Sequence, residues 1–337
     1  MSSEGAQGEG PMEEPVATAT QPPARGRWNL SPTLRTSLGV IGLAFLIHLI
    51  PLFLPRNMPE QELAIARVTV DVQHRLRLLK PLKDHPKATG AELREAAELL
   101  LEGAPAEARE LVEEAERRQP GQVETFLLRA RLCWVERMER CVHEAFEQAR
   151  RAAPGDARPD LLWADMREHD GDLATALEAV GRAWRKAPEE TSIQLRYMRL
   201  LSETGHHTEA DQVLQVVEPK LPPQQVLLER GQLRLKAGRY EEARQLFSKA
   251  VGEEPQSPLA HYNLGMAYFR LGNMDAAEEE LRAADRINVA DPRALAALCA
   301  MQVQAGQLEA ARVTKMDLER RFHDRQELIR SACWMQP

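Results

Sequence analysis

Cysteine, aromatic residues and an excess of positive charge are all scarce in this sequence. Four of its 337 residues are cysteine and 5% are aromatic. Cys133, Cys141, Cys299 and Cys333 show neither CxxC spacing nor a nearby histidine that would suggest zinc. The net charge of −7 argues against a nucleic-acid partner, because binding to phosphates needs a basic surface.

Catalytic and cofactor motifs are missing as well. The sequence has no glycine-rich phosphate loop, no HExxH and no GxSxG. His206 and His207 fall in a turn, where adjacent histidines are usually solvated surface rather than metal ligands. We therefore expect a protein that is not an enzyme, with no catalytic residues, no cofactor, no metal and no small-molecule substrate.

The N-terminal region consists of a polar tail followed by one long apolar run. Residues 1–30 are mostly Gly, Glu, Pro, Ser and Gln, which predicts a disordered tail. Leu38–Leu54 reads LGVIGLAFLIHLIPLFL and would span about 25 Å as a helix, which predicts one transmembrane helix. A buried core helix and a cleavable signal peptide are the alternatives. No small-x-small cleavage site follows Leu54, which favours an uncleaved anchor.

Charges around this run give only a weak indication of its orientation. Three arginines precede it within the relevant window and two follow it, which favours a cytoplasmic N-terminus and an exported C-terminal region. Arg75, Arg77, Lys80 and Lys83 lie just beyond the window and favour the opposite orientation. Within the run, His48 either packs as a neutral side chain or contacts a partner transmembrane helix. The sequence leaves both alternatives open.

The rest of the chain is a repeat with a period of 34 residues. A small or apolar residue recurs at steps of 34, 34, 34, 33, 34 and 34: Ala108, Val142, Ala176, Ala210, Ala243, Ala277 and Ala311. Five positions earlier stand Gly103, Arg137, Gly171, Gly205, Gly238, Gly272 and Gly306. A third column is Pro120, Pro154, Pro188, Pro222 and Pro255, which lapses at Val289. Such periodicity indicates stacked supersecondary units.

Each column has a physical reason in a helical hairpin. Small residues on facing helices permit close approach, and the first helix of most units also has one, for example Gly231, Gly265 and Cys299. A glycine between the helices supplies a left-handed turn. A proline ends the second helix. Ala, Leu, Glu and Arg, which are abundant here, favour helix.

The segment 258–291, PLAHYNLGMAYFRLGNMDAAEEELRAADRINVAD, resembles a tetratricopeptide repeat. Its matching residues are Asn263, Leu264, Gly265, Ala267, Tyr268, Gly272, Ala277 and Ala284. The unit 224–257 matches nearly as well. The remaining units are degenerate but in register: 89–122, 123–156, 157–190, 191–223 and 292–325. The resemblance implies an all-α fold, a right-handed α-solenoid of about seven hairpins over 89–325, stabilised by the stacking of neighbouring units.

The resemblance also implies a concave groove, lined by the first helices, that binds a peptide or helix of a protein partner. The candidate groove residues are Tyr262, Met266, Phe269, Arg196, Arg199, Asn263 and Arg293. Some family members clamp a C-terminal carboxylate. Here only Asn263 and Arg293 match that clamp, since Leu228, Gln232 and Ala297 replace its other members, so we do not expect it.

The two ends of the array need caps. A helix is expected over residues 60–80, within a juxtamembrane stalk over 55–88, and Pro81 should end it. At the other end the last helix is expected to continue from Leu308 towards Trp334, with 326–337 as a capping segment.

The cysteines have different expected roles. Cys133 and Cys141 lie near one turn and form either a disulfide or two buried thiols, while Cys299 is expected to serve as a small helix-contact residue.

Together these features predict a membrane-anchored scaffold that holds a protein partner and helps to assemble or operate a cell-envelope complex. The secretion, pilus, motility and cytochrome-biogenesis classes fit equally well. The expected location is a bacterial inner membrane, crossed once, with the array in the periplasm. A periplasmic chaperone for unfolded clients and a self-associating structural protein are the alternatives.

Overall fold

A computed structural model describes residues 59–334. The tail expected over 1–30 and the transmembrane helix expected over Leu38–Leu54 lie outside the described residues. None of the helices within 59–334 combines the length and the apolar character that a membrane crossing requires.

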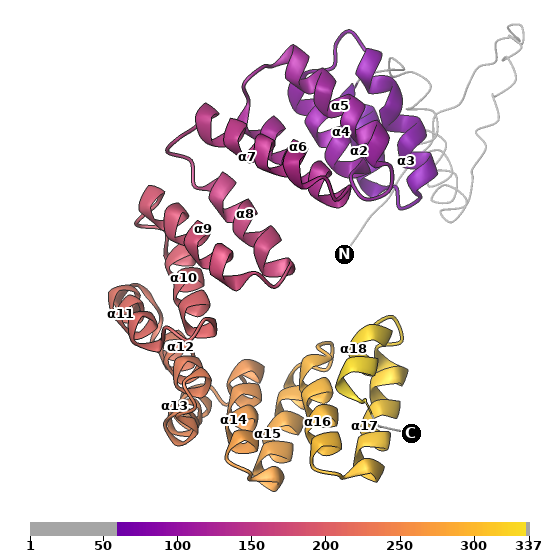
Figure 1. The fold of residues 1–337 in the computed structure, drawn as a ribbon. Helices are drawn as coiled ribbons and strands as arrows, with labels where there is room; N and C mark the ends of the chain where they lie inside the picture. The colour runs from indigo at the N-terminus through magenta and orange to yellow at the C-terminus, as the bar shows by residue number, and fades with distance from the viewer. Residues whose placement is uncertain (1–58, 335–337) are drawn as a thin grey trace, which may run out of the picture. The chain divides into compact units, whose positions relative to one another are not determined.

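Every regular element in residues 59–334 is helical, which confirms the all-α prediction (Figure 1). The elements are α2 (Pro59–Val68), α3 (Val72–Leu79), η1 (Lys80–Asp84), α4 (Gly90–Leu100), α5 (Pro105–Arg118), α6 (Val123–Val135), α7 (Glu139–Ala152), α8 (Arg158–His169), α9 (Leu173–Lys186), α10 (Thr191–Glu203), α11 (His207–Val217), η2 (Glu218–Lys220), α12 (Pro223–Lys236), α13 (Tyr240–Glu253), α14 (Pro258–Arg270), α15 (Met274–Ile287), α16 (Arg293–Gln304), α17 (Leu308–Arg321) and α18 (Gln326–Ala332).

From α4 to α17 the helices form seven consecutive hairpins, and each hairpin packs against the next. The buried apolar residues form a series of small clusters along the chain rather than one central core. A single hairpin cannot cover its own apolar face, so stability comes from the contacts between neighbours, as in other solenoids.

Two first-helix glycines show why small residues recur at this position. A Cβ built on Gly231 would lie 2.5 Å from the ring of Phe247 on the paired helix α13. At Gly265 it would lie 2.9 Å from Leu281 on α15. The missing Cβ atoms therefore let the two helices of each hairpin approach closely enough to exclude water.

The residue in the turn between the two helices of a unit, a glycine in most units, adopts the predicted left-handed conformation in all units but one. Five of these glycines, from Gly171 to Gly306, have φ between 72° and 86°, and Arg137 adopts the same left-handed region with φ 60°. Gly103 does not have positive φ. Its role is spatial, because a Cβ there would lie 2.6 Å from Val72 of α3. The left-handed turn predicted at Gly103 is therefore wrong.

Both caps differ from prediction. The single helix expected over 60–80 is two helices, α2 and α3, because Asp71 caps the start of α3 by accepting a hydrogen bond from the His74 N–H. The helix expected from Leu308 towards Trp334 ends at Arg321, and α18 follows as a separate helix. A disulfide between Cys299 of α16 and Cys333 fixes α18 on the last hairpin.

Candidate partner-binding groove

Three successive first helices, α10, α12 and α14, enclose a pocket of about 250 Å³. Its walls are Met198, Arg199, Ser202, Glu203, Glu229, Gln232, Leu233, Leu235, Lys236 and Asn263. On α10 and α12 most of these residues lie three or four positions apart and so share one helix face, and α14 contributes Asn263. The pocket has room for one or two side chains of a bound segment.

Ion pairs join neighbouring first helices at this pocket. The guanidinium of Arg199 on α10 donates hydrogen bonds to Glu229 on α12. Glu229 is only 5% exposed, so its charge depends on this partner for compensation. Lys236 of α12 lies 3.7 Å from Glu203 of α10 on the more exposed side. Two ion pairs thus connect α10 to α12 along the polar wall of the pocket.

Two buried polar groups in the same wall have no hydrogen-bond partner among the described residues. They are the hydroxyl of Ser202, in a residue 5% exposed, and the side-chain nitrogen of Asn263, in a residue 4% exposed. Leaving such groups unpaired costs about 1–3 kcal/mol each. A ligand that brought an acceptor to the Asn263 amide would recover part of that cost, which makes this wall suited to a backbone carbonyl.

A second, smaller hollow of about 130 Å³ holds Tyr262 and Arg293. Burial raises the pKa of the Tyr262 hydroxyl, so the group stays neutral at physiological pH. Arg293 donates to Asp291 at 2.8 Å and holds the pKa of that carboxyl below its usual range. Arg293 therefore has an anionic partner, as Arg199 and Lys236 do in the first pocket.

The remaining candidates lie outside both hollows. Arg196 binds Glu168 and Asp165 of α8, at 2.6 Å in each case. Met266 and Phe269 are half-buried on α14 and line neither hollow. Of the seven residues proposed from the sequence, the structure brings Arg199 together with Asn263, and Tyr262 together with Arg293.

The sequence reasoning did not propose Ser202, Glu229 or Lys236. A simple signal could have identified them. Counted from the start of each unit, positions six, nine, twelve and thirteen lie on one face of the first helix. In units 191–223 and 224–257 these positions include Ser202, Glu229 and Lys236.

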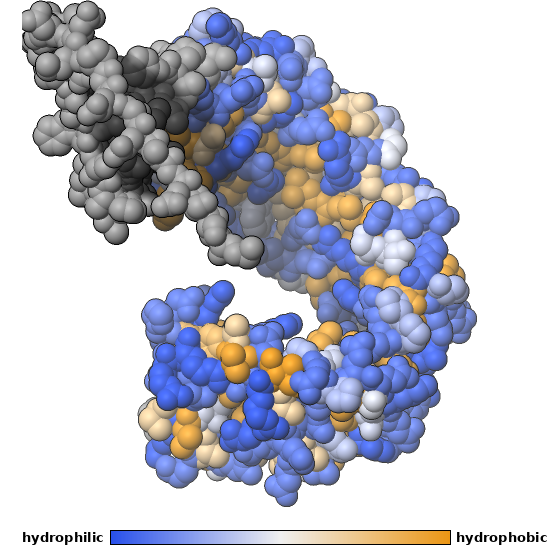
Figure 2. Space-filling model, turned by 180° about the vertical axis from the view of Figure 1, so that it is seen from behind, coloured by the Kyte–Doolittle hydropathy of each residue, from blue (hydrophilic) through white to orange (hydrophobic). Residues whose placement is uncertain are grey.

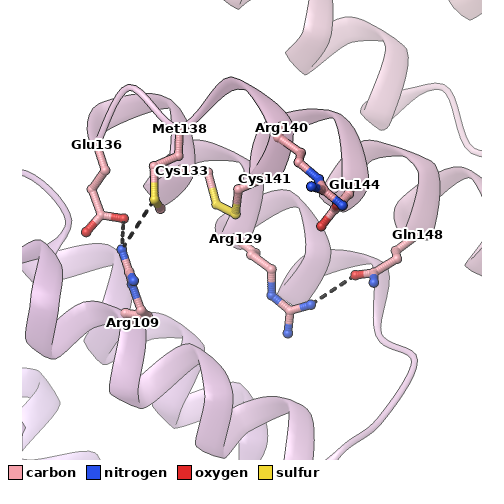
Figure 3. The surroundings of a disulfide bond; sticks show 9 residues. All are labelled: Arg109, Arg129, Cys133, Glu136, Met138, Arg140, Cys141, Glu144 and Gln148. Atoms are coloured by element: carbon pink, nitrogen blue, oxygen red, sulfur yellow. Dashed lines mark hydrogen bonds and ion pairs between the residues drawn. A yellow bond between two sulfur atoms is a disulfide. The ribbon is translucent and has the colours of Figure 1, made fainter.

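The structure resolves the alternatives left open for the cysteines. Cys133 and Cys141 form a disulfide across the α6–α7 turn, as Figure 3 shows. Around it, Arg109 of the preceding hairpin bonds Glu136 and Met138, and Arg129 donates to Gln148 at 2.9 Å. Cys299 is not merely a small contact residue, since it pairs with Cys333. None of the four cysteines is free.

No group of three or more potential metal ligands (His, Cys, Asp or Glu) gathers in residues 59–334. On the face seen in Figure 2 the surface is largely hydrophilic, with hydrophobic residues in separate patches. The pocket between α10, α12 and α14 is therefore our candidate site.

Comparisons with known proteins agree with this architecture. Residues 234–301 match the model of the tetratricopeptide repeat. Over 130 residues the chain is 32% identical to interferon-induced protein with tetratricopeptide repeats 3 of Mus musculus, a match that covers 33% of this chain and 32% of that protein. The chain thus aligns with about a third of that curated relative.

Two solved structures are similar in fold. A tetratricopeptide repeat protein from Parabacteroides merdae aligns with a TM-score of 0.56 at 18% identity, covering 72% of this chain and 97% of that one. Yeast Tom70 aligns with a TM-score of 0.52 at 13% identity, covering 92% of this chain and 75% of that one. The seven hairpins therefore have the fold of tetratricopeptide-repeat proteins, and residues 234–301 match the repeat model itself.

Proposed function

We propose that this protein is a membrane-anchored scaffold of the bacterial cell envelope whose first helices hold a segment of a protein partner. The observation that supports the groove is the pocket between α10, α12 and α14, where the Ser202 hydroxyl and the Asn263 side-chain nitrogen are buried without a partner among residues 59–334. Natural proteins pair nearly all such groups, so unpaired ones beside a pocket favour a ligand that supplies the missing partner.

The chemistry of the pocket favours an extended peptide. Met198, Leu233 and Leu235 offer an apolar floor for one side chain. Gln232 and Asn263 can donate to backbone carbonyls, which occur in every peptide. The rim carries both signs of charge, with Lys236 opposite Glu203, and this favours a partner of mixed charge over a strongly acidic one.

The anchor and the location belong to the same proposal. The apolar run Leu38–Leu54 would tether the array to the bilayer and raise its local concentration near a membrane complex. Both cysteine pairs are disulfides, which favours an oxidising compartment such as the periplasm over a reducing cytosol. The class of complex, whether secretion, pilus, motility or cytochrome biogenesis, remains part of the proposal.

Filling the pocket tests the groove. Gln232→Trp adds a large side chain at the pocket wall, so we expect it to abolish partner capture and leave the helical circular-dichroism signal unchanged. Gln245→Trp is the matched control, because Gln245 is exposed on the second helix α13. Equal capture by both variants would contradict the groove proposal.

Photocrosslinking in native membranes identifies the partner. A photoreactive residue at Gln232 should give one discrete adduct, and a residue at Val216, exposed on α11, should give none. Many unrelated adducts would instead support a chaperone, and adducts with the chain itself would support self-association. Protease digestion of intact spheroplasts then reports the side of the membrane, since an exported array is cut and a cytoplasmic one is protected.

A further inference from the structure

The corner between α2 and α3 displays apolar side chains to solvent. Val70 is 90% exposed, Val68 80% and Ile65 48%. Val70 and Val68 are the two most exposed large apolar side chains in residues 59–334. Single exposed apolar residues are common, but three within six positions form a local apolar surface.

This corner is a fixed part of the fold. Leu63 and Ala66, on the opposite face of α2, are buried in the N-terminal core. The Arg75 guanidinium donates to the Thr69 carbonyl at 2.6 Å and to the Leu99 carbonyl at 2.9 Å. These bonds join the corner to α4, so the valines are held outwards by the structure and do not result from a frayed end.

The position of the corner in the chain suggests what covers it. Only residues 55–58 separate the apolar run Leu38–Leu54 from the start of α2. Four extended residues reach at most about 14 Å. α2 itself has 10 residues and is about 15 Å long. With two further residues to Val70, the chain length limits the separation between the corner and the end of the proposed anchor to roughly 36 Å.

The local charge also fits a lipid surface. Residues 59–80 contain four basic residues (Arg67, Arg75, Arg77 and Lys80) and three acidic residues (Glu60, Glu62 and Asp71), a local net charge of +1. The whole chain has a net charge of −7. Arg67 is paired with Glu95 and the Arg75 guanidinium is bonded within the fold, so the exposed Arg77 is the arginine that can reach the anionic headgroups near the valines.

We propose that Ile65, Val68 and Val70 insert into the headgroup–acyl boundary of the membrane that carries the anchor. This rests on the proposed anchor at Leu38–Leu54. The contact would hold the first hairpins against the bilayer, and the array would then project from a fixed base instead of swinging on a free linker.

A single added thiol tests this contact in the full-length chain. Because all four native cysteines are paired, Val70→Cys provides one reactive site for a polarity-sensitive dye. The labelled chain is placed in nanodiscs of anionic lipid, with and without doxyl-labelled lipid. Val289→Cys is the matched control, since Val289 is 62% exposed and lies in the turn after α15. We expect a blue shift and strong doxyl quenching at position 70 and neither at position 289.

A second variant measures how much the valines contribute. In a chain labelled at Ile65→Cys, the double substitution Val68→Asp and Val70→Asp should lower the ratio of membrane-inserted to non-inserted molecules. We expect a decrease of about tenfold for each valine that is replaced.

Each other outcome is decisive. A chain that fails to enter the nanodisc overturns both the anchor and the insertion. A chain that enters but shows equal quenching at positions 70 and 289 overturns the insertion alone. A blue shift that depends on protein concentration without doxyl quenching means that a second copy covers the corner, which also overturns it.

Discussion

The hairpins α6–α9 and α12–α15 have the same architecture and are stabilised by different interactions. The α12–α15 pair, most of which lies in the region matched by the repeat model, uses Gly238 and Gly272 in its turns and Gly231 and Gly265 between its helices. In α6–α9, Arg137 occupies a left-handed turn and a disulfide spans the same turn.

The α6–α9 pair also buries interactions that its counterpart lacks. Asp160 is fully buried and is surrounded by Arg150, Arg182 and Lys186, at distances of 2.7–3.2 Å. Trp163 packs against Phe146, with ring centroids 5.1 Å apart. Units that depart from the repeat pattern are therefore stabilised by covalent, ionic and aromatic contacts. The regular units instead have glycine at the turns and at the closest helix contacts.

The largest expected effect comes from removing the buried charge. Asp160→Asn leaves three cations without their shared anion, so we expect a loss of about 3 kcal/mol in the stability of α8 and α9. Hydrogen exchange of their amides measures this. The control is Asp285→Asn in α15, where the ion pair with Arg321 is more exposed and a loss of about 1 kcal/mol is expected.

The stability difference between wild type and Asp160→Asn should also depend on pH. Burial raises the pKa of Asp160, but hydrogen bonds from Lys186 and Arg182 outweigh it, and the pKa lies below the ordinary value. A carboxyl whose pKa is lowered by folding stabilises the protein above its unfolded pKa of about 3.9. That stabilisation is lost as the pH falls through the folded value. The gap between wild type and Asp160→Asn should therefore close in acid, and a constant gap would show that the charge of Asp160 is not responsible.

The next effect is that of the disulfide. Replacing Cys133 and Cys141 by serine removes a short covalent loop, which should destabilise α6–α7 by roughly 2.5 kcal/mol. Exchange in α14–α15 should be unchanged in the same sample and serves as the internal control. If α6–α7 exchanges at the wild-type rate, the turn does not depend on the bond.

Gly231→Ala tests the regular region in the same way. Its new Cβ would lie 2.5 Å from the Phe247 ring, so we expect overpacking to outweigh the gain in helix propensity and cost about 1–2 kcal/mol. Gly252→Ala is the matched control on α13, because nothing lies within 4 Å of its Cβ. That variant should gain up to about 1 kcal/mol. Denaturant midpoints of the two variants should move in opposite directions, and a shared direction would contradict the packing argument.

The smallest effect is expected at the irregular turn. Arg137→Gly removes a side chain from the left-handed region and should stabilise the protein by about 1 kcal/mol. Gly272→Ala, at the equivalent turn of the regular region, should destabilise it by a similar amount. Thermal unfolding of both variants tests whether the two turns have the same backbone requirement.

The sequence predicted the fold well because the repeat is encoded locally. Small residues at helix contacts, glycines at turns and prolines at helix ends recur every 33 or 34 residues, and each acts within its own hairpin. Repetition also made single departures, such as Arg137, visible as substitutions in an otherwise regular column. The sequence was less informative about the caps, where no repeat exists for comparison and α2, α3 and α18 begin at local features.

The candidate groove was predicted only in part. Arg199 and Asn263 were proposed from their helix positions, but their convergence with Ser202 and Glu229 depends on how three separate helices stack. The unpartnered state of the Ser202 and Asn263 side chains also depends on every neighbour that could have bonded them.

The sequence by itself determined the hairpin, its period and the places where the pattern lapses, because these depend on backbone conformation and on contacts within about forty residues. Only the tertiary structure decided that Gly103 makes room for Val72, that Cys299 meets Cys333 and that Val68 and Val70 face solvent. These facts depend on which surface of a helix its neighbours cover, and burial of that kind is a property of the whole stack rather than of any one repeat.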